Sequence, residues 1–457
     1  MSAATVVLTI DLFGVNVALP TIAADLDLSD AALQWVVSIY YLALAAPLIA
    51  AGRIGDILGR RRVLLAGAAL AAVGSLTAAL APDGAVLIAA RGVSGVGAAF
   101  VTALSLSIVS DAFPAARRGI AIGIWSAVGA IGAAAGPLVG GVVTETLGWR
   151  WLFAIDVPVA LSAMVVTVVV VRESRDPGAH GVDVTGVVLA TVGFGLLSFG
   201  LLQGPDAGWG SPGVVLALVG AGMALVAFVV VELRVAEPLV DLGWLRRPPA
   251  SGTGAVALAG NAAFATVMLY LTLYFQGVRG DGPIETGVAF LAFTIPMALG
   301  SPLAGMLATH APVRLTMAGG LLLVLGGAAC FATITVGSDA TLAYLGLALS
   351  GVGQAIVFNV TNIADVSSVS RARSGMAAGV VSGVRQIGSL LGLAVAGAAF
   401  AAAGGTVLAS GAIGGSAAGF VDGLRAAMIV TIVFCVGGLA AVPWARTTST
   451  ASTAPPS

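Results

Sequence analysis

The sequence predicts an all-α integral membrane protein with fourteen transmembrane helices. Three observations support this fold class: 59% of the 457 residues are hydrophobic, only 9% are charged, and arginines gather in every second connection between long apolar runs. A soluble domain of this size carries about 25% charged residues. Nearly all of the chain is therefore expected to lie in or against a lipid bilayer.

Each predicted span is an apolar run of the length that crosses a bilayer, roughly 20 residues. The fourteen runs lie near 4–24, 32–52, 63–81, 84–106, 119–142, 152–171, 184–203, 213–233, 251–275, 285–308, 315–336, 340–362, 375–402 and 424–444. The connections are short, which leaves no room for a soluble domain. The Thr-, Ser- and Pro-rich residues 446–457 predict a disordered tail.

The arginines fix the predicted orientation. All twenty basic residues are Arg, and with the N-terminus inside, fifteen loop arginines face the cytoplasm while only Arg150, Arg279 and Arg425 face out. By the positive-inside rule, both termini are cytoplasmic. The lack of lysine excludes a phosphate-loop ATPase, and the net charge of −1 gives no reason to expect nucleic acid. The two cysteines lie in apolar runs and predict no metal site.

The connection between spans 2 and 3 reads GRIGDILGRRR over residues 52–62. Three glycines, four arginines and one aspartate between two apolar runs predict a tight turn at the cytoplasmic surface. The stretch resembles the signature loop between helices 2 and 3 of the major facilitator superfamily, although Ile57 replaces a basic residue. The resemblance implies a role in conformational gating for Gly52, Asp56, Gly59, Arg60 and Arg61.

This resemblance extends over roughly residues 5–444 and implies two six-helix bundles plus two extra helices. A weak echo of the 52–67 segment at 305–319 is consistent with duplicated halves, a common transporter construction. The expected organisation is an N-terminal bundle (1–171), two inserted helices with cytoplasmic linkers (172–249), a C-terminal bundle (250–445) and the tail (446–457).

Span 1 carries Asp11 and Asn16. A carboxylate inside a span is costly and indicates function by default. The sequence around both residues resembles the first helix of the 14-span drug:proton antiporter branch, with Phe13 and Gly14 replacing Thr-Ile. That resemblance implies proton or substrate coupling by Asp11. The alternative is a structural Asp at the inner end of the span, because only ten residues precede it.

Two further ionisable residues fall inside spans of the N-terminal half. Arg91 shares one helical face with Gly95 and Ala99, so this face must point into the bundle. Its surroundings resemble the superfamily's helix-4 motif, which implies that Arg91 assists proton transfer; a static salt bridge is the alternative. Asp156 stands where the 14-span branch has Asn, and it adds a possible second coupling acid.

Span 5 carries a ridge of small residues. Gly132, Gly136 and Gly140 recur every four residues, a pattern for close helix packing that any helix pair can use. Together with Pro137 and Gly141, the ridge resembles the antiporter signature of the superfamily. The resemblance favours export over uptake.

The C-terminal half shows no clear acid within a span, because Asp365 falls just past the predicted inner end of span 12. This predicts neutral or weakly anionic substrates rather than dications. Arg385, deep in span 13, serves either helix packing or the binding of an anionic or carbonyl group. Further substrate-binding candidates are Asn16, Tyr40, Tyr41, Asn261 and Asn359, each equally suited to hydrogen bonding between helices.

The resemblance therefore implies proton-coupled antiport that exports small, largely hydrophobic drugs or antibiotics across the bacterial cytoplasmic membrane by alternating access. We expect no enzyme activity, no metal, no cofactor beyond the proton gradient, and a monomer in the lipid bilayer. The alternatives are a proton-coupled uptake symporter for a nutrient and a non-transporting membrane sensor or scaffold. General drug efflux and export of a self-made antibiotic remain equally open.

Overall fold

The computed structural model describes most of the chain between residues 14 and 445. The described residues are 14–15, 18–19, 21–28, 30–45, 47–175, 183–235, 238, 240, 242–367, 369, 374–406 and 415–445. Asp11, Asn16 and the tail 446–457 lie outside them.

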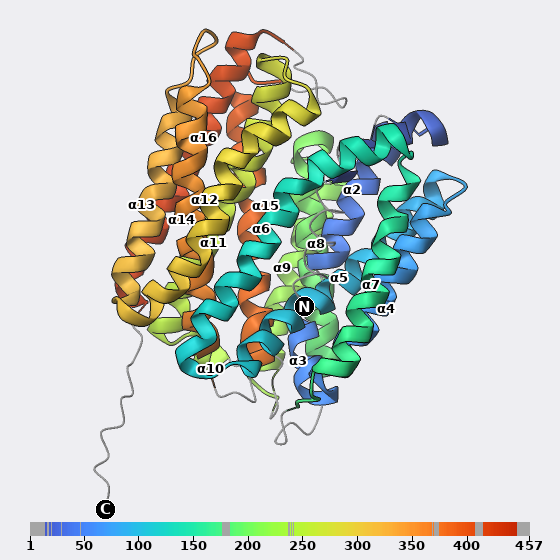
Figure 1. Ribbon diagram of the computed structural model, residues 1–457, viewed down its shortest axis with the longest axis vertical. Helices are drawn as coiled ribbons and strands as arrows, with labels where there is room; N and C mark the ends of the chain where they lie inside the picture. The colour runs from blue at the N-terminus through green and yellow to red at the C-terminus, as the bar shows by residue number, and fades with distance from the viewer. Residues whose placement is uncertain are drawn as a thin grey trace, which may run out of the picture.

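The described residues form helices and no strands, which confirms the predicted all-α membrane fold (Figure 1). The first group comprises α2 (Asp30–Ala45), α3 (Leu48–Leu58), α4 (Arg60–Ala79), α5 (Gly84–Ala112), α6 (Ala115–Thr146) and α7 (Arg150–Val170). The middle pair is α8 (Val184–Ala207) and α9 (Pro212–Glu232). The last group comprises α10 (Leu242–Leu245), α11 (Pro248–Leu273), the π-helix η1 (Tyr274–Val278), α12 (Pro283–His310), α13 (Val313–Ala332), α14 (Thr341–Ser367), α15 (Ser374–Ala402), α16 (Ala417–Ala441) and the 3₁₀ turn η3 (Val442–Trp444).

Eleven helices within the described residues are long and apolar enough to cross a membrane. They correspond to predicted spans 3, 4 and 6–14. Span 5 coincides with α6, span 1 lies largely outside the described residues, and the total of fourteen stays a prediction. Span 2, predicted as one run over 32–52, is divided into α2 and α3 around Pro47. Proline lacks the N–H that a continuous helix needs at this point.

The predicted turn at 52–62 is much shorter than expected. Helix α3 continues to Leu58, and α4 begins at Arg60, so Gly59 alone makes the turn. Gly59 has a φ of 107°, a conformation that side chains with a Cβ rarely adopt. The arginines therefore belong to the first turn of α4 rather than to a loop.

Several helices start where the sequence supplies a capping group. The Asp83 carboxylate accepts the Val86 N–H at 2.9 Å at the start of α5. The Asp183 carboxylate accepts the Gly186 N–H at 2.8 Å at the start of α8. Such contacts satisfy N–H groups that have no partner within the helix.

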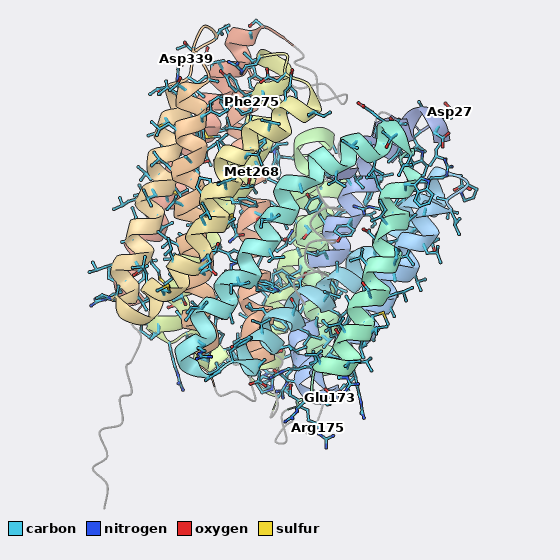
Figure 2. All side chains as sticks on the ribbon, in the orientation of Figure 1. Asp27, Glu173, Arg175, Met268, Phe275 and Asp339 are labelled. Atoms are coloured by element: carbon cyan, nitrogen blue, oxygen red, sulfur yellow. The ribbon has the colours of Figure 1, made fainter. Side chains whose placement is uncertain are left out.

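The two ends of the molecule differ in charge. Figure 2 shows Arg175 and Glu173 at one end and Asp27 and Asp339 at the opposite end. We call these the arginine-rich end and the acidic end. The arginine-rich end also contains the start of α4, and it is the side predicted to face the cytoplasm.

The helices before α8 and after α10 form two groups, which we call the N-bundle and the C-bundle. Within the N-bundle, α4 packs against α5 and α7; within the C-bundle, α13 packs against α14 and α11 against α15. The two bundles meet along α6–α12 and α3–α15. The α8–α9 hairpin packs through α8 against α2, α3 and α15, so it contacts both bundles.

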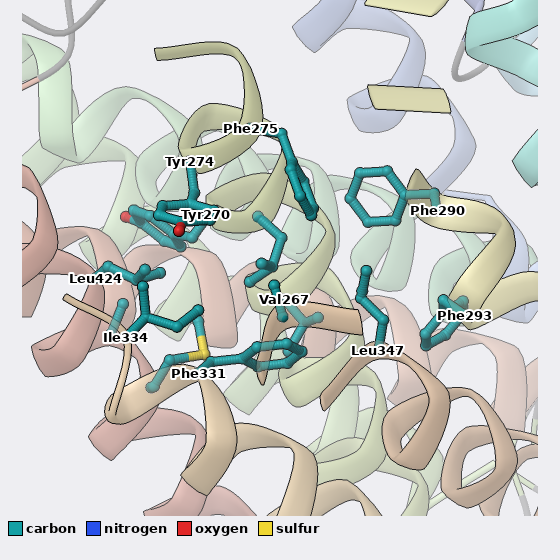
Figure 3. Packing of buried hydrophobic residues seen from close by; sticks show 14 of the residues in the cluster. Val267, Tyr270, Tyr274, Phe275, Phe290, Phe293, Phe331, Ile334, Leu347 and Leu424 are labelled. Atoms are coloured by element: carbon teal, nitrogen blue, oxygen red, sulfur yellow. The ribbon is translucent and has the colours of Figure 1, made fainter. Parts of the chain in front are cut away.

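The C-bundle has an aromatic core (Figure 3), and its residue Phe275 lies toward the acidic end (Figure 2). Phe275 packs edge-on against Phe290 with ring centroids 6.2 Å apart, and Phe331 and Leu347 lie in the same cluster. Because lipid tails are as apolar as these side chains, burial from water does not drive their association. Dispersion contacts between well-packed atoms stabilise this core instead.

The span-5 glycines make a close helix contact in the N-bundle. A Cβ added at Gly140 would lie 2.5 Å from the Gly14 carbonyl oxygen, and one added at Gly14 would lie 3.0 Å from the Gly136 carbonyl oxygen. The ridge therefore lets α6 lie directly against the backbone of the first helix. Gly132 and Gly141 are buried as well, and Pro137 lies within α6 with its side chain outside the described residues.

We predict that Gly140→Ala lowers the free energy of unfolding by about 1–3 kcal/mol, because a methyl group would overlap backbone atoms that cannot rotate away. Gly222→Ala on α9 is the matched control, since a Cβ there meets nothing within 4 Å. Unfolding by SDS in mixed micelles, followed by tryptophan fluorescence, measures both variants. Equal stability of the two variants would contradict the proposed contact.

Candidate functional site

Arg60 is the centre of a buried charge cluster at the arginine-rich end. Its Nε donates to Asp56 Oδ1 at 2.9 Å, and its Nη1 donates to Asp111 Oδ2 at 2.9 Å. Arg60 is 1% exposed and Asp56 is fully buried. Asp56 lies in the last turn of α3, Arg60 begins α4, and Asp111 lies in the last turn of α5. One guanidinium therefore joins three helices. We call these three residues the Arg60 cluster.

Asp111 was not identified from the sequence, although one signal existed. It is an acidic residue at the inner end of span 4, on the side where the loops are otherwise rich in arginine. An acid in that position has many basic partners available, and the structure shows that Arg60 is the one it contacts.

Glu173 is a second residue that sequence reasoning missed. It follows α7, and its carboxylate accepts the backbone N–H groups of Arg61 at 3.0 Å and Arg62 at 3.2 Å. It therefore caps the N-terminus of α4, where a negative charge is favourable. A Cβ at Gly59 would lie 2.6 Å from this carboxylate, which would have to shift, whereas the φ angle of Gly59 strains any other residue at this position.

Arg91 lies inside the N-bundle, as predicted. It is 1% exposed, its Nε donates to the Val36 carbonyl at 3.3 Å, and its Cζ lies 4.2 Å from the Tyr40 ring centroid. Phe153 of α7 lies on a second side, 5.5 Å from Cζ. Aromatic faces and a carbonyl stabilise a cation that has left water.

Asp156 lies one helical turn after Phe153 on α7. It is 7% exposed, and its Oδ2 accepts the Ser75 hydroxyl of α4 at 3.2 Å. Since Phe153 contacts Arg91, the structure brings Arg91 and Asp156 into one neighbourhood of the N-bundle. Tyr40 belongs to the same neighbourhood, and Tyr41 packs edge-on against Tyr40 at 6.4 Å. Asp11 and Asn16 lie outside the described residues.

The expectation of a C-terminal half without a buried acid is wrong. Helix α14 extends to Ser367, five residues beyond the predicted end of span 12, so Asp365 lies within it and is 2% exposed. The Thr253 hydroxyl of α11 donates to its carboxylate. The preference for neutral over dicationic substrates rested on the missing acid and loses its basis.

Arg385 anchors α15 to α14. Its guanidinium donates to Asn362 Oδ1 at 2.8 Å, to Thr361 Oγ1 at 2.8 Å and to the Phe358 carbonyl at 2.9 Å. Of the two roles considered for Arg385, these contacts support helix packing. Its Cζ also lies 4.0 Å from the centroid of the Phe358 ring.

The two asparagines proposed for substrate binding are buried in the C-bundle. The Asn261 amide donates to the Ala257 carbonyl at 3.0 Å, and the Asn359 amide donates to the Ala355 carbonyl at 2.8 Å. Both bonds return to the residue's own helix, a pattern that leaves the side chain against the backbone. The structure does not bring these two residues together with Tyr40 and Tyr41.

A shallow, open apolar groove lies along α5 beside Ile39 of α2, on a face where Ala85, Ala89 and Val93 are exposed. Its lining residues are Ile39, Ala85, Ile88, Ala89, Gly92, Val93 and Val96. None of the predicted substrate-binding residues that the structure describes lines this groove. Among the described residues, no group of three or more His, Cys, Asp or Glu side chains could hold a metal.

A surface pair joins the ends of helices at the acidic end. Arg150 and the Trp149 indole N–H both donate to the Asp25 carboxylate. The hydrogen bond from Arg150 is the main reason that the pKa of Asp25 is lowered from its ordinary 3.8. A lowered pKa means that the contribution of this pair is present at neutral pH and is lost as the pH falls through the lowered pKa.

We predict that Asp56→Asn lowers the free energy of unfolding by about 3 kcal/mol, because breaking a buried ion pair leaves a charge poorly compensated. Arg62→Gln is the control: the Arg62 side chain is 79% exposed and lies 3.7 Å from Glu173. An exposed pair of this kind contributes below about 1 kcal/mol. SDS titrations measure the free energy of unfolding of both variants. A larger loss of this free energy in Arg62→Gln than in Asp56→Asn would refute the prediction.

Comparisons with known proteins agree with this architecture. The Major Facilitator Superfamily profile matches residues 1–393. The chain is 36% identical to "Multidrug resistance protein Stp" of Mycobacterium tuberculosis, over 86% of this chain and 73% of that protein. It is 34% identical to "Puromycin resistance protein pur8" of Streptomyces alboniger, over 96% and 87% of the two chains. It is 35% identical to "Cephamycin export protein CmcT" of Amycolatopsis lactamdurans, over 83% and 80%.

A solved structure shows the same fold. The crystal structure of the human organic anion transporter MFSD10 superposes with a TM-score of 0.67, covering 97% of this chain and 98% of that chain at 16% identity. The matched profile, the curated relatives and the fold together show that the chain belongs to the major facilitator superfamily and is a multi-pass membrane transporter.

Proposed function

We propose that this transporter exports small, largely hydrophobic drugs or antibiotics in exchange for protons, by alternating access. The observation that carries the proposal is the similarity over nearly the full chain to proteins named for puromycin resistance and cephamycin export. The relatives come from Mycobacterium, Streptomyces and Amycolatopsis, which supports a bacterial cytoplasmic membrane.

Proton coupling is assigned to the N-bundle. Asp156 and Arg91 lie in one buried neighbourhood, and Asp11 is proposed to join them from the first helix. A carboxylate that is protonated on one side of the membrane and deprotonated on the other carries one positive charge inward per cycle. That proton supplies about 2.3 kcal/mol per 100 mV of membrane potential and about 1.4 kcal/mol per pH unit.

Alternating access between inward-open and outward-open states requires that each bundle moves as a rigid body. The Arg60 cluster joins α3, α4 and α5 and keeps the arginine-rich end of the N-bundle rigid. The α6–α12 and α3–α15 contacts are then the surfaces along which the bundles separate. We propose that Gly52, Gly59 and Arg61 serve the same gating unit, with both termini in the cytoplasm, as the fifteen-to-three distribution of loop arginines indicates.

The decisive experiment uses inverted membrane vesicles that are energised to be acid inside. We predict that they accumulate compounds from a panel that includes puromycin and ethidium, and that a protonophore abolishes the accumulation. We expect Asp156→Asn to reduce accumulation to the level of empty vesicles if Asp156 carries the coupled proton. Asp11→Asn tests the acid of the first helix in the same way.

Asp25→Asn is the matched control, because it makes the same chemical change in an exposed acid at the acidic end. It should leave accumulation unchanged. Uptake of the same compounds into right-side-out vesicles under an inward proton gradient would instead identify a symporter. Normal, protonophore-sensitive accumulation in both Asp156→Asn and Asp11→Asn would remove coupling from the N-bundle acids.

A further inference from the structure

An aromatic contact joins the two bundles. Trp125 of α6 stacks on Phe358 of α14 with ring centroids 6.2 Å apart and an angle of 21° between the ring planes. Trp125 is 6% exposed, and Leu106, Ile122 and Ile363 pack around the pair. The two rings come from opposite halves of the chain, so the stack exists only while the bundles are together here.

Phe358 is held in place by Arg385. The guanidinium carbon lies 4.0 Å from the centroid of the Phe358 ring, and three hydrogen bonds fix the guanidinium to α14. A planar guanidinium bound in this way has little freedom to move, and it stabilises an aromatic face beside it. The Phe358 ring therefore has Arg385 of its own bundle beside it and Trp125 of the N-bundle stacked on it.

Asp365 extends this arrangement to a third helix. Its carboxylate accepts the Thr253 hydroxyl of α11. Together with the hydrogen bonds from Arg385 to α14, this contact links α11, α14 and α15 through buried polar groups. The ring is presented to Trp125 by a polar cluster buried inside the C-bundle, not by a mobile loop.

Three contacts between the bundles lie in the half near the arginine-rich end. Trp125 is ten residues from the start of α6, about 15 Å along the helix. Nearby, a Cβ at Gly123 would lie 2.6 Å from the Ser301 carbonyl oxygen of α12. On the other side, Ala50 of α3 packs in one cluster with Ala377 and Val380 of α15. This conformation is therefore closed at the arginine-rich end.

One detail indicates that the closed contact is not fully satisfied. The Trp125 indole N–H is buried and has no hydrogen-bond partner among the described residues. A buried donor without a partner is unfavourable. The stack thus combines a favourable ring contact with an unsatisfied polar group, as suits a contact that must open and close in every cycle.

We propose that Trp125 and Phe358 form the gate that closes the arginine-rich end, and that Arg385 is the positioning residue that holds Phe358 in the closed arrangement. The role of this gate in transport rests on the proposed export cycle. The closure itself does not, because it can be measured as the accessibility of a side chain between the bundles.

The test uses a cysteine-free background, with Cys330 and Cys435 replaced by Ala, and a reporter thiol at Val109→Cys. Val109 packs against the cluster that contains Trp125 and Phe358. Labelling by a membrane-impermeant maleimide is followed in inverted and right-side-out vesicles. We expect Phe358→Ala and Trp125→Ala each to raise the labelling rate from the arginine-rich side about tenfold, a shift of 1.4 kcal/mol in the closing equilibrium.

Phe264→Ala is the matched control. It removes a ring that pairs with Phe293 at 5.7 Å within the C-bundle, in a different cluster from that of Trp125 and Phe358. Phe264→Ala should leave the labelling rate of the reporter thiol unchanged. Trp125→Phe keeps an aromatic face and should restore most of the closure lost in Trp125→Ala. An equal rise in Phe264→Ala, or no rise in Phe358→Ala and Trp125→Ala, would overturn the gate.

The positioning role of Arg385 is tested in two backgrounds. Arg385→Lys keeps the charge but loses the planar fork that makes several bonds at once. We expect Arg385→Lys to raise the labelling rate of the reporter thiol when Phe358 is present. In the Phe358→Ala background it should cause no further rise, because the two residues act through one contact. Additive effects in the double variant would contradict the positioning role.

A reversible cross-link provides a test that does not depend on weakening the fold. Cysteines placed at Trp125 and Phe358 in the same cysteine-free background should be joined by a bismaleimide that contains a reducible disulfide. The cross-link should stop accumulation of the transported compound, and reduction of the linker should restore it. A cross-link that leaves transport intact would refute the gate. A cross-link and altered labelling in a protein that transports nothing would retain the gate and reject the proposed export function.

Discussion

The cost of placing charge in an apolar medium governs this structure. Only 9% of the residues are charged, so each buried charge must find a partner, and for Arg60, Arg91 and Arg385 the partner comes from another helix. Arg60 joins three helices through Asp56 and Asp111. Arg91 is enclosed by Tyr40, Phe153 and a carbonyl of α2. In a bilayer, where burial from water offers no advantage over lipid, these few polar contacts act together with close packing to determine which helices lie together.

The sequence could predict features that depend on local pattern. The length of the apolar runs, the burial of Arg91 and the small-residue ridge from Gly132 to Gly140 all follow from spacing along one helix. The glycine ridge even indicated a close helix contact, and the structure shows Gly14 as its partner. The predicted turn at 52–62 was too long, because helical periodicity alone does not show that one glycine with a positive φ can complete it.

Features that depend on distant partners were not predictable from pattern. Asp111 is 51 residues from Arg60, and Glu173 is 112 residues from Arg61. No periodicity connects such positions. Asp365 was misplaced for a different reason: hydropathy marks where a span becomes polar, but helix α14 continues past that point and buries the acid against Thr253. Trp125 and Phe358 carry no sequence signal, since an aromatic residue in a span is ordinary until its neighbour is known.

The α8–α9 hairpin has a consequence for how the molecule can move. Helix α8 contacts α2 and α3 of the N-bundle and α15 of the C-bundle, and Trp35 of α2 stacks on Phe199 of α8 at 5.7 Å. When two bodies rock about a shared axis, a third body in contact with both cannot remain fixed to each. The hairpin must travel with one bundle and slide over the other. The moving parts therefore number three. The apolar face of α8 that packs against α3 and α15 is the surface along which they slide.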